Sequence, residues 1–394
     1  MKNAITTLRI QNFKSIKDVE MTPRRVNIII GEPNVGKSNL LEAISLLGAG
    51  LYEENTRFLG EVLRYETVAN LFYDNDTGHP VTVEASTGNA ILAADERNNG
   101  HYLFVQISDE WWRQYKAVVK EQGEGVVYLS EKKTTEEALQ QLAALELGDN
   151  RMMSALNQKK VQDSNFAYVQ VKVRDNGDKE GFRTHYHTPA ALPKKYVYRF
   201  GQPHNQSSRY AFLQPPLGHN LLSIVQKSPA LRREMAALFK PYGLSLVLRV
   251  GERKFEIQKQ VEDLVYSYPY SGIADTLQRL IFYLAAIESN DDAVILLEEP
   301  EAHSFPVYVS QLGQRIVASR NNQFFVATHS PYLITEVLEE MLTNDELAPE
   351  LALFVAYYED YQTKVRQLSD EEVLNIRRDG LDVFYNMARF VPQR

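Results

Sequence analysis

Residues 31–38 read Gly-Glu-Pro-Asn-Val-Gly-Lys-Ser, a complete phosphate-binding pattern G-x-x-x-x-G-K-S. The apolar run Val26–Ile30 precedes them and is short and β-branched, as expected of a buried parallel strand. Apolar residues then recur at helical spacing, at Leu40, Leu41, Ile44 and Leu47. A strand, a glycine loop and a helix in this order direct N–H groups at a phosphate. A chance glycine-rich turn would not predict these flanks, so we expect a nucleoside triphosphate to bind here.

The two last residues of the pattern have distinct expected roles. Lys37 would reach the β- and γ-phosphates, and the Ser38 hydroxyl would bind Mg²⁺. ATP and Mg²⁺ are therefore the expected cofactors. The expected ATP-binding residues are Gly31, Glu32, Pro33, Asn34, Val35, Gly36, Lys37, Ser38 and Asn39.

Two further apolar strands end in residues that could do chemistry. Residues 293–297 are followed by Glu298 and Glu299, and Gln323–Ala327 is followed closely by His329. Open parallel sheets bind ligands at the carboxyl ends of their strands. The sequence therefore predicts that these two strand ends and the phosphate loop converge on one nucleotide.

The adjacent carboxylates of Glu298 and Glu299 can have different roles, because successive side chains of an extended segment point to opposite sides. Glu298 would hold Mg²⁺, directly or through water, and Glu299 would polarise the water that attacks the γ-phosphate. His329 would donate a hydrogen bond to the γ-phosphate or the water. The alternatives are a solvated acidic loop and a structural histidine. The acidic loop has a disadvantage as a purely structural feature, because two adjacent like charges repel each other when they are buried without a cation nearby.

Composition narrows the classes of protein. The chain has 394 residues, a formal net charge of −8 and no cysteine. Disulfides and cysteine-ligated zinc are thus excluded, and a reducing cytoplasm is the expected location. No apolar stretch is long enough to span a bilayer, and the N-terminus lacks a signal-peptide pattern.

A nucleic-acid contact would need a local basic patch, because the chain as a whole is acidic. Two stretches are candidates for such a patch: Lys194, Lys195, Arg199 and Arg209 in the first, and Arg249, Arg253 and Lys254 in the second. The more ordinary interpretation of each is a solvated charged face.

The remaining elements are predicted from periodicity and turn residues. Short alternating runs between positions 51 and 264 predict strands at 81–84, 102–107, 126–129, 166–173 and 196–200, with a hairpin loop at 175–178. Helices are predicted at 135–147, Pro229–Phe239, a segment spanning 277–287, and 309–318. The tail predicts a strand near 353–357 and a helix that starts at Ser369 with a capping box to Glu372.

These motifs together resemble the ABC-type ATPases of the SMC and RecF kind. They look most like the ATPase domains of OLD-family nucleases and related anti-phage ATPases. The resemblance rests on residues 8–17, 31–39, 297–303 and 327–331 and is vague across the middle of the chain. It implies an α/β P-loop fold of the ABC-ATPase type, with a mostly parallel core sheet, an antiparallel β lobe and a β-rich and helical insertion. The expected division is 1–50 and 265–394 for the ATPase core and 51–264 for the β-rich lobe and insertion.

In that family two protomers sandwich two ATP molecules, and a serine-glycine signature of one protomer contacts the γ-phosphate held by the other. The matching residues are Ser271 and Gly272, ahead of an amphipathic helix. The alternative is an ordinary N-cap by Ser271. Glu298 departs from the Asp that many relatives carry, Gln106 is a guess for the Q-loop glutamine, and Lys14 is expected near the adenine or ribose.

The resemblance also implies what to expect of function. Too few residues follow His329 for a Toprim nuclease domain, and there is no heptad run for a coiled-coil arm. We therefore expect a Mg²⁺-dependent ATPase that associates through an ATP sandwich as a homodimer or higher oligomer. It would regulate a separate nuclease or toxin effector in bacterial anti-phage defence. A RecF-like DNA-repair ATPase and a nucleotide-gated scaffold with little turnover remain as alternatives.

Overall fold

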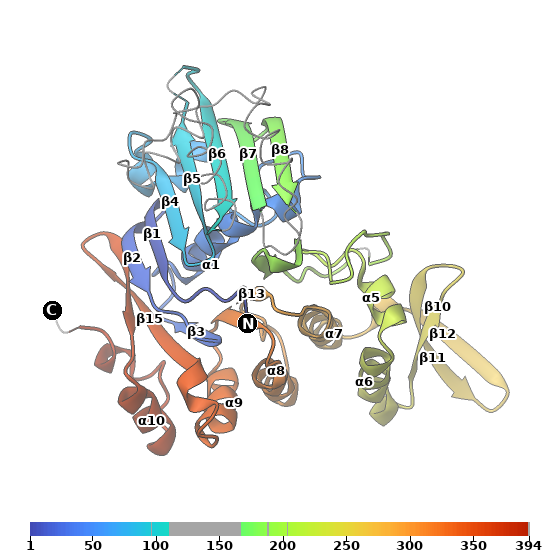
Figure 1. The fold of residues 1–394 in the computed structure, drawn as a ribbon. Helices are drawn as coiled ribbons and strands as arrows, with labels where there is room; N and C mark the ends of the chain where they lie inside the picture. Colours follow the sequence, from blue (N-terminus) through green and yellow to red (C-terminus); the bar gives the residue numbers. More distant parts are fainter. Residues whose placement is uncertain (96, 110–166, 187–188, 203, 393–394) are drawn as a thin grey trace.

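The computed structural model describes residues 1–95, 97–109, 167–186, 189–202 and 204–392, which form three sheets and the helices that cover them. In Figure 1 an antiparallel lobe lies above a mostly parallel sheet, and a smaller sheet extends to one side. The strand expected at 126–129 and the helix expected at 135–147 lie outside the described residues.

The mostly parallel sheet carries the three strand ends singled out by the sequence. Five of its strands run parallel, and β16 is an antiparallel edge strand. In spatial order the strands are β16 (Gln362–Gln367), β15 (Leu351–Glu359), β3 (Val26–Ile30), β14 (Gln323–Ala327), β13 (Val294–Glu298) and β9 (Lys194–Tyr196). Ala327 pairs with Ile29 on one side and Glu298 on the other, so the strand ends meet at one edge. The predicted convergence of these strand ends is confirmed.

Both faces of this sheet are covered, which explains why its strands read as continuous apolar runs. Ile28 and Ile30 belong to a core shared with the helices below the sheet, whereas Ile29 belongs to a second core shared with α1 and the antiparallel lobe. All five residues of β3 are buried. The helices are α1 (Lys37–Ser45), α5 (Leu221–Lys227), α6 (Pro229–Phe239), α7 (Asp275–Glu288), α8 (Pro306–Ala318), α9 (Pro331–Leu342) and α10 (Asp370–Arg378).

The antiparallel lobe is a seven-stranded sheet that begins with the first two strands of the chain. Its spatial order is β2 (Ile16–Met21), β1 (Leu8–Phe13), β4 (Val81–Ala85), β5 (Gly88–Ala94), β6 (His101–Ser108), β7 (Ala167–Arg174) and β8 (Lys179–Tyr186). The strands predicted near 81–84, 102–107 and 166–173 are confirmed within a residue or two, as is the hairpin loop between β7 and β8. Because β1 belongs to this lobe, the lobe draws on residues from both sides of position 51.

One predicted strand is wrong. Residues 196–200 were expected to be extended in the insertion, but β9 ends at Tyr196 and pairs with β13 in the core sheet. The chain leaves the sheet after Tyr196, where the Val197 N–H donates to the Pro216 carbonyl at 2.9 Å and not to a carbonyl of a neighbouring strand. The division of the chain into domains at positions 51 and 264 thus stays a prediction. One strand of the core sheet, β9, comes from within the expected insertion.

The third sheet consists of β10 (Ser245–Arg249), β11 (Lys254–Val261) and β12 (Leu264–Pro269). It follows α6, whose predicted bounds are confirmed and whose N-cap is Ser228, with its hydroxyl accepting from the Leu231 N–H. The C-terminal helix α10 has the predicted capping box between Ser369 and Glu372. The bounds of α6 and the capping box of α10 were therefore predicted correctly.

Candidate functional site

The phosphate loop is held by residues from both ends of the chain. Gly36 is the N-cap of α1 and has a φ of 95°, a left-handed conformation that favours glycine. Thr363 of β16 donates its hydroxyl to the Val35 carbonyl at 2.9 Å, and Ser15 Oγ lies 2.6 Å from Thr363 Oγ1. A Cβ at position 36 would lie 2.1 Å from Thr363 Oγ1. Ser15 and Thr363 could not be predicted as part of the loop, because no local sequence pattern relates them to it.

Lys37 folds back over the loop. Its ammonium donates to the carbonyls of Gly31 at 2.9 Å and Glu32 at 2.7 Å, and the residue is 7% exposed. Burial lowers the pKa of Lys37 to about 8, although the nearby Glu299 and Glu298 carboxylates oppose this shift. The ammonium therefore lies at the loop and donates two of its three N–H groups to backbone oxygens.

Glu298 sits among basic and hydroxyl groups. Its carboxylate accepts a hydrogen bond from the Ser38 hydroxyl. It also forms an ion pair with Lys195, with 2.9 Å between Lys195 Nζ and Glu298 Oε2, and Arg64 Nη2 lies 3.7 Å from Glu298 Oε1. Burial opposes ionisation, but Lys195 and Ser38 hold the pKa of Glu298 below its ordinary value. The structure thus places Ser38 and Glu298, the two expected Mg²⁺ ligands, in contact.

A second carboxylate, Glu42 of α1, lies under the same region. Glu42 is fully buried and pairs with Lys14 and, at 2.6 Å, with Arg64. Lys14 also donates to the Arg64 carbonyl at 2.6 Å. Lys14 is therefore engaged in this network, and no contact places it where the adenine or ribose was expected.

Glu299 and His329 face each other across the ends of β13 and β14. His329 Nε2 lies 3.5 Å from Glu299 Oε1, and the Glu299 side chain is 53% exposed. Burial lowers the pKa of His329, and the Lys37 ammonium lowers it further against the opposing effect of Glu299. This shift favours the neutral imidazole, which has one N–H to donate.

A buried carboxylate positions the histidine segment. Glu301 is 8% exposed and accepts hydrogen bonds from the Thr328 hydroxyl at 2.5 Å and the His329 N–H at 3.1 Å. Burial raises the pKa of Glu301, with the hydrogen bonds opposing the shift. Sequence reasoning missed Glu301, since only the fold shows which of the acids after β13 turns inward.

A pocket of about 300 Å³ opens beside these groups. Ser38, Glu298 and Glu299 line it together with Arg64, Tyr198 and Arg279. Arg279 comes from α7 and stacks over the Tyr198 ring at 4.7 Å, while its buried Nε has no hydrogen-bond partner among the described residues. The pocket therefore joins the phosphate-loop side to the helix that follows Ser271.

The chemistry of these groups fits Mg²⁺. The ion takes oxygen ligands and is held by one or two side chains plus substrate phosphates, with water completing the shell. Ser38 and Glu298 supply two such oxygens, and within the described ranges no cluster of three or more His, Cys, Asp or Glu side chains offers a rival metal site.

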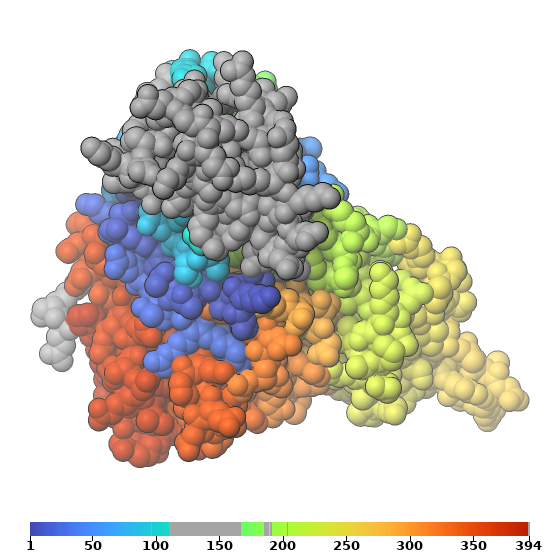
Figure 2. All heavy atoms as spheres, viewed as in Figure 1, coloured from blue at the N-terminus to red at the C-terminus, as the bar shows by residue number. Residues whose placement is uncertain are grey.

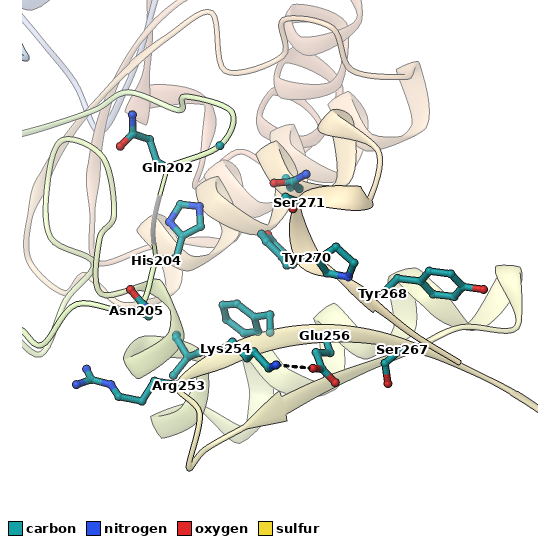
Figure 3. Close-up of a pocket in the computed structure, with 15 residues that line it drawn as sticks. Gln202, His204, Asn205, Arg253, Lys254, Glu256, Ser267, Tyr268, Tyr270 and Ser271 are labelled. Atoms are coloured by element: carbon teal, nitrogen blue, oxygen red, sulfur yellow. Dashed lines mark ion pairs between the residues drawn. The ribbon is translucent and has the colours of Figure 1, made fainter. Parts of the chain in front are cut away.

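Ser271 and Gly272 lie apart from these residues, in the short turn η7 (Tyr270–Gly272) between β12 and α7. Both are exposed, and Ser271 lines a second pocket of about 470 Å³, which residues 201–202 and 204–205 line together with β11 and β12, as shown in Figure 3. The N-cap of α7 is Ala274, with no side-chain capping bond, so the alternative role of Ser271 as the N-cap is wrong.

The remaining sequence candidates lie elsewhere. Gln106 is 2% exposed within β6, paired on both sides by strands of the antiparallel lobe, so the guess that it is the Q-loop residue gains no support. The basic-patch hypothesis is wrong for Lys194 and Lys195, which are 0% and 2% exposed. These two lysines lie on β9 inside the core sheet, where burial lowers the pKa of Lys194 to about 7.

Two of the three basic residues in the second stretch are paired with nearby acids. Arg249 pairs with Glu256 at 2.5 Å, and Lys254 pairs with Glu252 at 2.6 Å and Glu256 at 2.9 Å. Figure 3 shows the Lys254–Glu256 pair at the floor of the second pocket. These contacts give no support to a DNA-binding face.

A phosphate loop at the carboxyl edge of a mostly parallel sheet, flanked by paired acids and a histidine, defines an α/β P-loop ATPase. The chain belongs to the AAA ATPase domain family, which it matches over residues 1–207. It is an ATPase, and within the described residues no helix is long and apolar enough to cross a membrane.

Beyond that family, the known proteins that resemble this chain have low sequence identity to it. The chain is 21% identical over 378 residues to an ATP/GTP phosphatase of Helicobacter pylori (strain ATCC 700392 / 26695), covering 90% of this chain and 93% of the relative. A Pyrococcus furiosus Smc head domain, bound to the C-terminal domain of ScpA, has a TM-score of 0.48 and 13% identity over 96% of this chain and 99% of its own. The SMC head domain from Thermotoga maritima has a TM-score of 0.37 and 11% identity, with 93% and 99% coverage.

Proposed function

We propose that the chain binds Mg²⁺–ATP on the loop 31–39, hydrolyses it with Glu299 and His329, and associates through the bound nucleotide with a second protomer. The observation that carries this proposal is the meeting of Lys37, the Ser38–Glu298 pair and the Glu299–His329 pair at one sheet edge. Electrostatic coupling between Lys37 and both acids, and between Lys37 and His329, supports a single site.

Each side chain has a role that follows from its contacts. Lys37 exchanges the carbonyls of Gly31 and Glu32 for phosphate oxygens when the nucleotide enters, so its charge is used in a site that excludes water. Ser38 and Glu298 offer oxygens to the metal ion, which neutralises phosphate charge when bound. Lys195 holds Glu298 ionised and in place beforehand.

Glu299 is the only one of the two adjacent acids with an open side chain, which suits the group that must reach a water molecule. The neutral His329 donates its N–H toward developing charge, and Glu301 holds the His329 backbone through the bond at 3.1 Å. Hydrolysis would thus need both strand ends to stay in register, which the β13–β14 pairing provides.

The second protomer would supply Ser271 and Gly272. Both are exposed, and Gly272 has open space around its Cα, with Pro269 Cγ the nearest atom at 3.8 Å from an added Cβ. Their N–H groups precede α7 and could approach a phosphate from outside. Arg279 on the same helix lines the pocket with Glu299, so α7 links the signature segment to the hydrolytic groups.

The output we propose is regulation of a separate effector protein, a nuclease or toxin, in bacterial defence against phage. The support is the resemblance of residues 8–17, 31–39, 297–303 and 327–331 to anti-phage ATPases. The relative from Helicobacter is described as an ATP/GTP phosphatase, so we include GTP as a second substrate.

Two variants test the site. Lys37→Ala should weaken ATP binding by at least about 100-fold and abolish nucleotide-driven association. Glu299→Gln should keep ATP binding, lower turnover by about 10²–10⁴-fold and accumulate the associated form. Fluorescent-nucleotide titration, phosphate release and light scattering measure the three properties.

The matched control is Glu346→Gln, the same change at an exposed glutamate away from the site, which should behave as wild type. Normal ATP-dependent association of Lys37→Ala would refute the site assignment. In cells, the gene with its neighbours should reduce phage plating and the Lys37→Ala version should not; equal plating would refute the defence role alone.

A further inference from the structure

The hairpin β11–β12 projects from the body of the molecule with one strand uncovered. Figures 1 and 2 show it, in yellow, extending away from the helices and the two larger sheets. All six residues of β12 are exposed, and β12 is the free edge of its sheet among the described residues. The other edge strand, β10, packs near α6. A free, exposed edge strand offers unpaired backbone groups to another strand.

One face of the hairpin is mostly apolar and continues the protein core, with Lys259, which pairs with Tyr266, as a charged residue on it. Ile257 on this face is 2% exposed and belongs to the core below the parallel sheet. Farther out along the same face the apolar side chains lose their cover: Tyr268 is 47%, Tyr266 47%, Leu264 60% and Val261 42% exposed. Cross-strand pairing of Ile257 with Tyr268 and of Val261 with Leu264 places them together.

The opposite face is mostly polar, and it includes Gln258, Gln260 and Ser267. Figure 3 shows Tyr268 and its neighbour Ser267 pointing in different directions from β12. Such alternation is expected of a sheet with one buried face. The apolar face is thus built to be covered, although the described residues of this chain do not cover it.

The backbone of β12 has a simple pattern of outward groups. The two-residue turn between Val261 and Leu264 directs the Leu264 N–H to β11, so alternation leaves the N–H and C=O of Val265 and Ser267 facing outward. The next outward residue, Pro269, has no N–H and ends the usable edge. The outward pairs are therefore symmetric about Tyr266.

We propose that β12 pairs antiparallel with β12 of a second copy of this chain, about a two-fold axis at Tyr266. Val265 then bonds to Ser267 of the second copy, the two Tyr266 side chains face each other, and Leu264 lies opposite Tyr268 of the second copy. Two three-stranded sheets become one six-stranded sheet whose apolar face is doubled in width.

A second copy fits this edge because nothing in the register opposes it. No residue of Leu264–Pro269 is charged, and the one proline lies at the end of the strand, whereas soluble proteins protect free edges with charges or with proline inside the strand. At the ends of the pairing, acidic Asp263 meets Pro269 of the second copy, so like charges do not face each other. Non-hydrogen-bonded antiparallel pairs bring side chains closest, which favours the Tyr266 contact on the axis.

This interface is separate from the nucleotide and does not rest on the proposed ATP sandwich. Because β12 runs directly into η7, the pairing would hold the Ser271–Gly272 segments of two copies at a fixed spacing before ATP arrives. Association through β12 is therefore independent of ATP and persists when the phosphate loop is disabled.

A single-cysteine experiment tests the register, because the chain has no cysteine of its own. Tyr266→Cys places two thiols opposite each other at a Cα separation of about 4.5 Å, within the range that a disulfide spans. Mild oxidation of this variant should give a covalent dimer without ATP, at a rate at least about tenfold above Val265→Cys or Ser267→Cys. Those controls are equally exposed, but each meets a different residue across the axis.

The cross-link should also form when Tyr266→Cys is combined with Lys37→Ala, which separates this proposal from the ATP-driven association. No dimer from Tyr266→Cys, or equal rates at positions 265, 266 and 267, would overturn the proposal. A pairing partner that is another protein would give the same negative result.

A backbone variant tests the mode of pairing. Ser267→Pro removes an outward N–H but no hairpin bond, so it should slow cross-linking of Tyr266→Cys by at least about tenfold. Ser267→Ala, which keeps the N–H, should leave the rate unchanged. Unchanged melting temperature shows that the hairpin still folds, and equal cross-linking rates for the two variants would refute strand pairing.

Discussion

At the residue scale, the state of Lys37 is set by competition between burial and charge. Its ammonium is satisfied by the Gly31 and Glu32 carbonyls, and burial lowers its pKa to about 8 despite the nearby acids. Carbonyl oxygens stabilise an ammonium less than phosphate oxygens do. In this environment Lys37 therefore loses its charge at a pH only slightly above neutral.

This argument predicts a pH dependence of ATP binding. The nucleotide favours charged Lys37, so affinity is fully present below pH 8 and falls as pH rises through the pKa of about 8. The loss should approach about tenfold per pH unit above that value. Calorimetry in buffers of different ionisation enthalpy should also detect proton uptake on binding near pH 8.

Lys37→Arg is the matched control, because a guanidinium stays charged across this range. It should bind ATP more weakly than wild type but with a flat profile between pH 7 and pH 9. Parallel profiles for the two proteins would assign the pH dependence to another group.

At the element scale, the phosphate loop depends on strands far from it in sequence. The β15–β16 hairpin supplies Thr363, and the turn between β1 and β2 supplies Ser15, whose hydroxyl also accepts from Asn39 at 2.7 Å. Together they hold the loop through Val35 and the first turn of α1 through Asn39. The C-terminal hairpin is thus part of the nucleotide site, although it carries no residue expected to touch ATP.

We expect Gly36→Ala to disrupt this packing. The added Cβ would lie 2.1 Å from Thr363 Oγ1 and 2.9 Å from Ser15 Oγ, on a backbone with a φ of 95°. ATP affinity should fall by about tenfold or more, with a lower melting temperature, because the loop must move away from β16.

Gly201→Ala is the comparison, since Gly201 also has a positive φ, of 77°, but no atom lies within 4 Å of its added Cβ. That change should cost only the backbone strain, about 1–2 kcal/mol, and leave ATP affinity unchanged. Equal effects of both variants on ATP affinity would show that the contact with Thr363 does not shape the loop.

At the scale of the whole molecule, the proposed site is divided between copies. Lys37, Glu298 and Glu299 meet at one sheet edge, whereas Ser271 and Gly272 are exposed just before the N-terminus of α7, where Ser271 lines a different pocket. A protomer would then be active only when a second copy supplies the signature segment.

This division predicts complementation. Ser271→Arg and Lys37→Ala should each be inactive alone, but a mixture should recover about a quarter of wild-type turnover, because half of the dimers then hold one intact site of two. Phosphate release after subunit exchange measures it. Mixing Lys37→Ala with Glu299→Gln should recover nothing, since both changes affect the same side of each site.

Rescue by the second mixture as well, or by neither, would contradict a site shared in trans. A Ser271→Arg protein that turns over ATP normally would lead to the same conclusion. ATP binding by Ser271→Arg should remain near wild type, which separates loss of the trans contact from loss of the loop.

The sequence by itself determined the local parts of this molecule. The phosphate loop, the buried strands Val26–Ile30 and Gln323–Ala327, and the Ser369 capping box depend on residues adjacent in the chain. Backbone geometry, side-chain period and capping act over a few residues, so their patterns can be read without the fold. The convergence of three strand ends followed from the general rule for parallel sheets.

Tertiary structure alone decided the partners of those parts. It buried Lys194 and Lys195 in β9, paired Lys195 with Glu298, brought Thr363 to the loop and left β12 as an edge that the described residues do not cover. In sequence these lysines look like an exposed basic stretch. Such contacts join residues separated by a hundred positions or more, and burial depends on how whole sheets pack. No local pattern encodes these contacts or the burial of these residues, because the energy of a charged group or of a free strand edge depends on which distant residues pack against it.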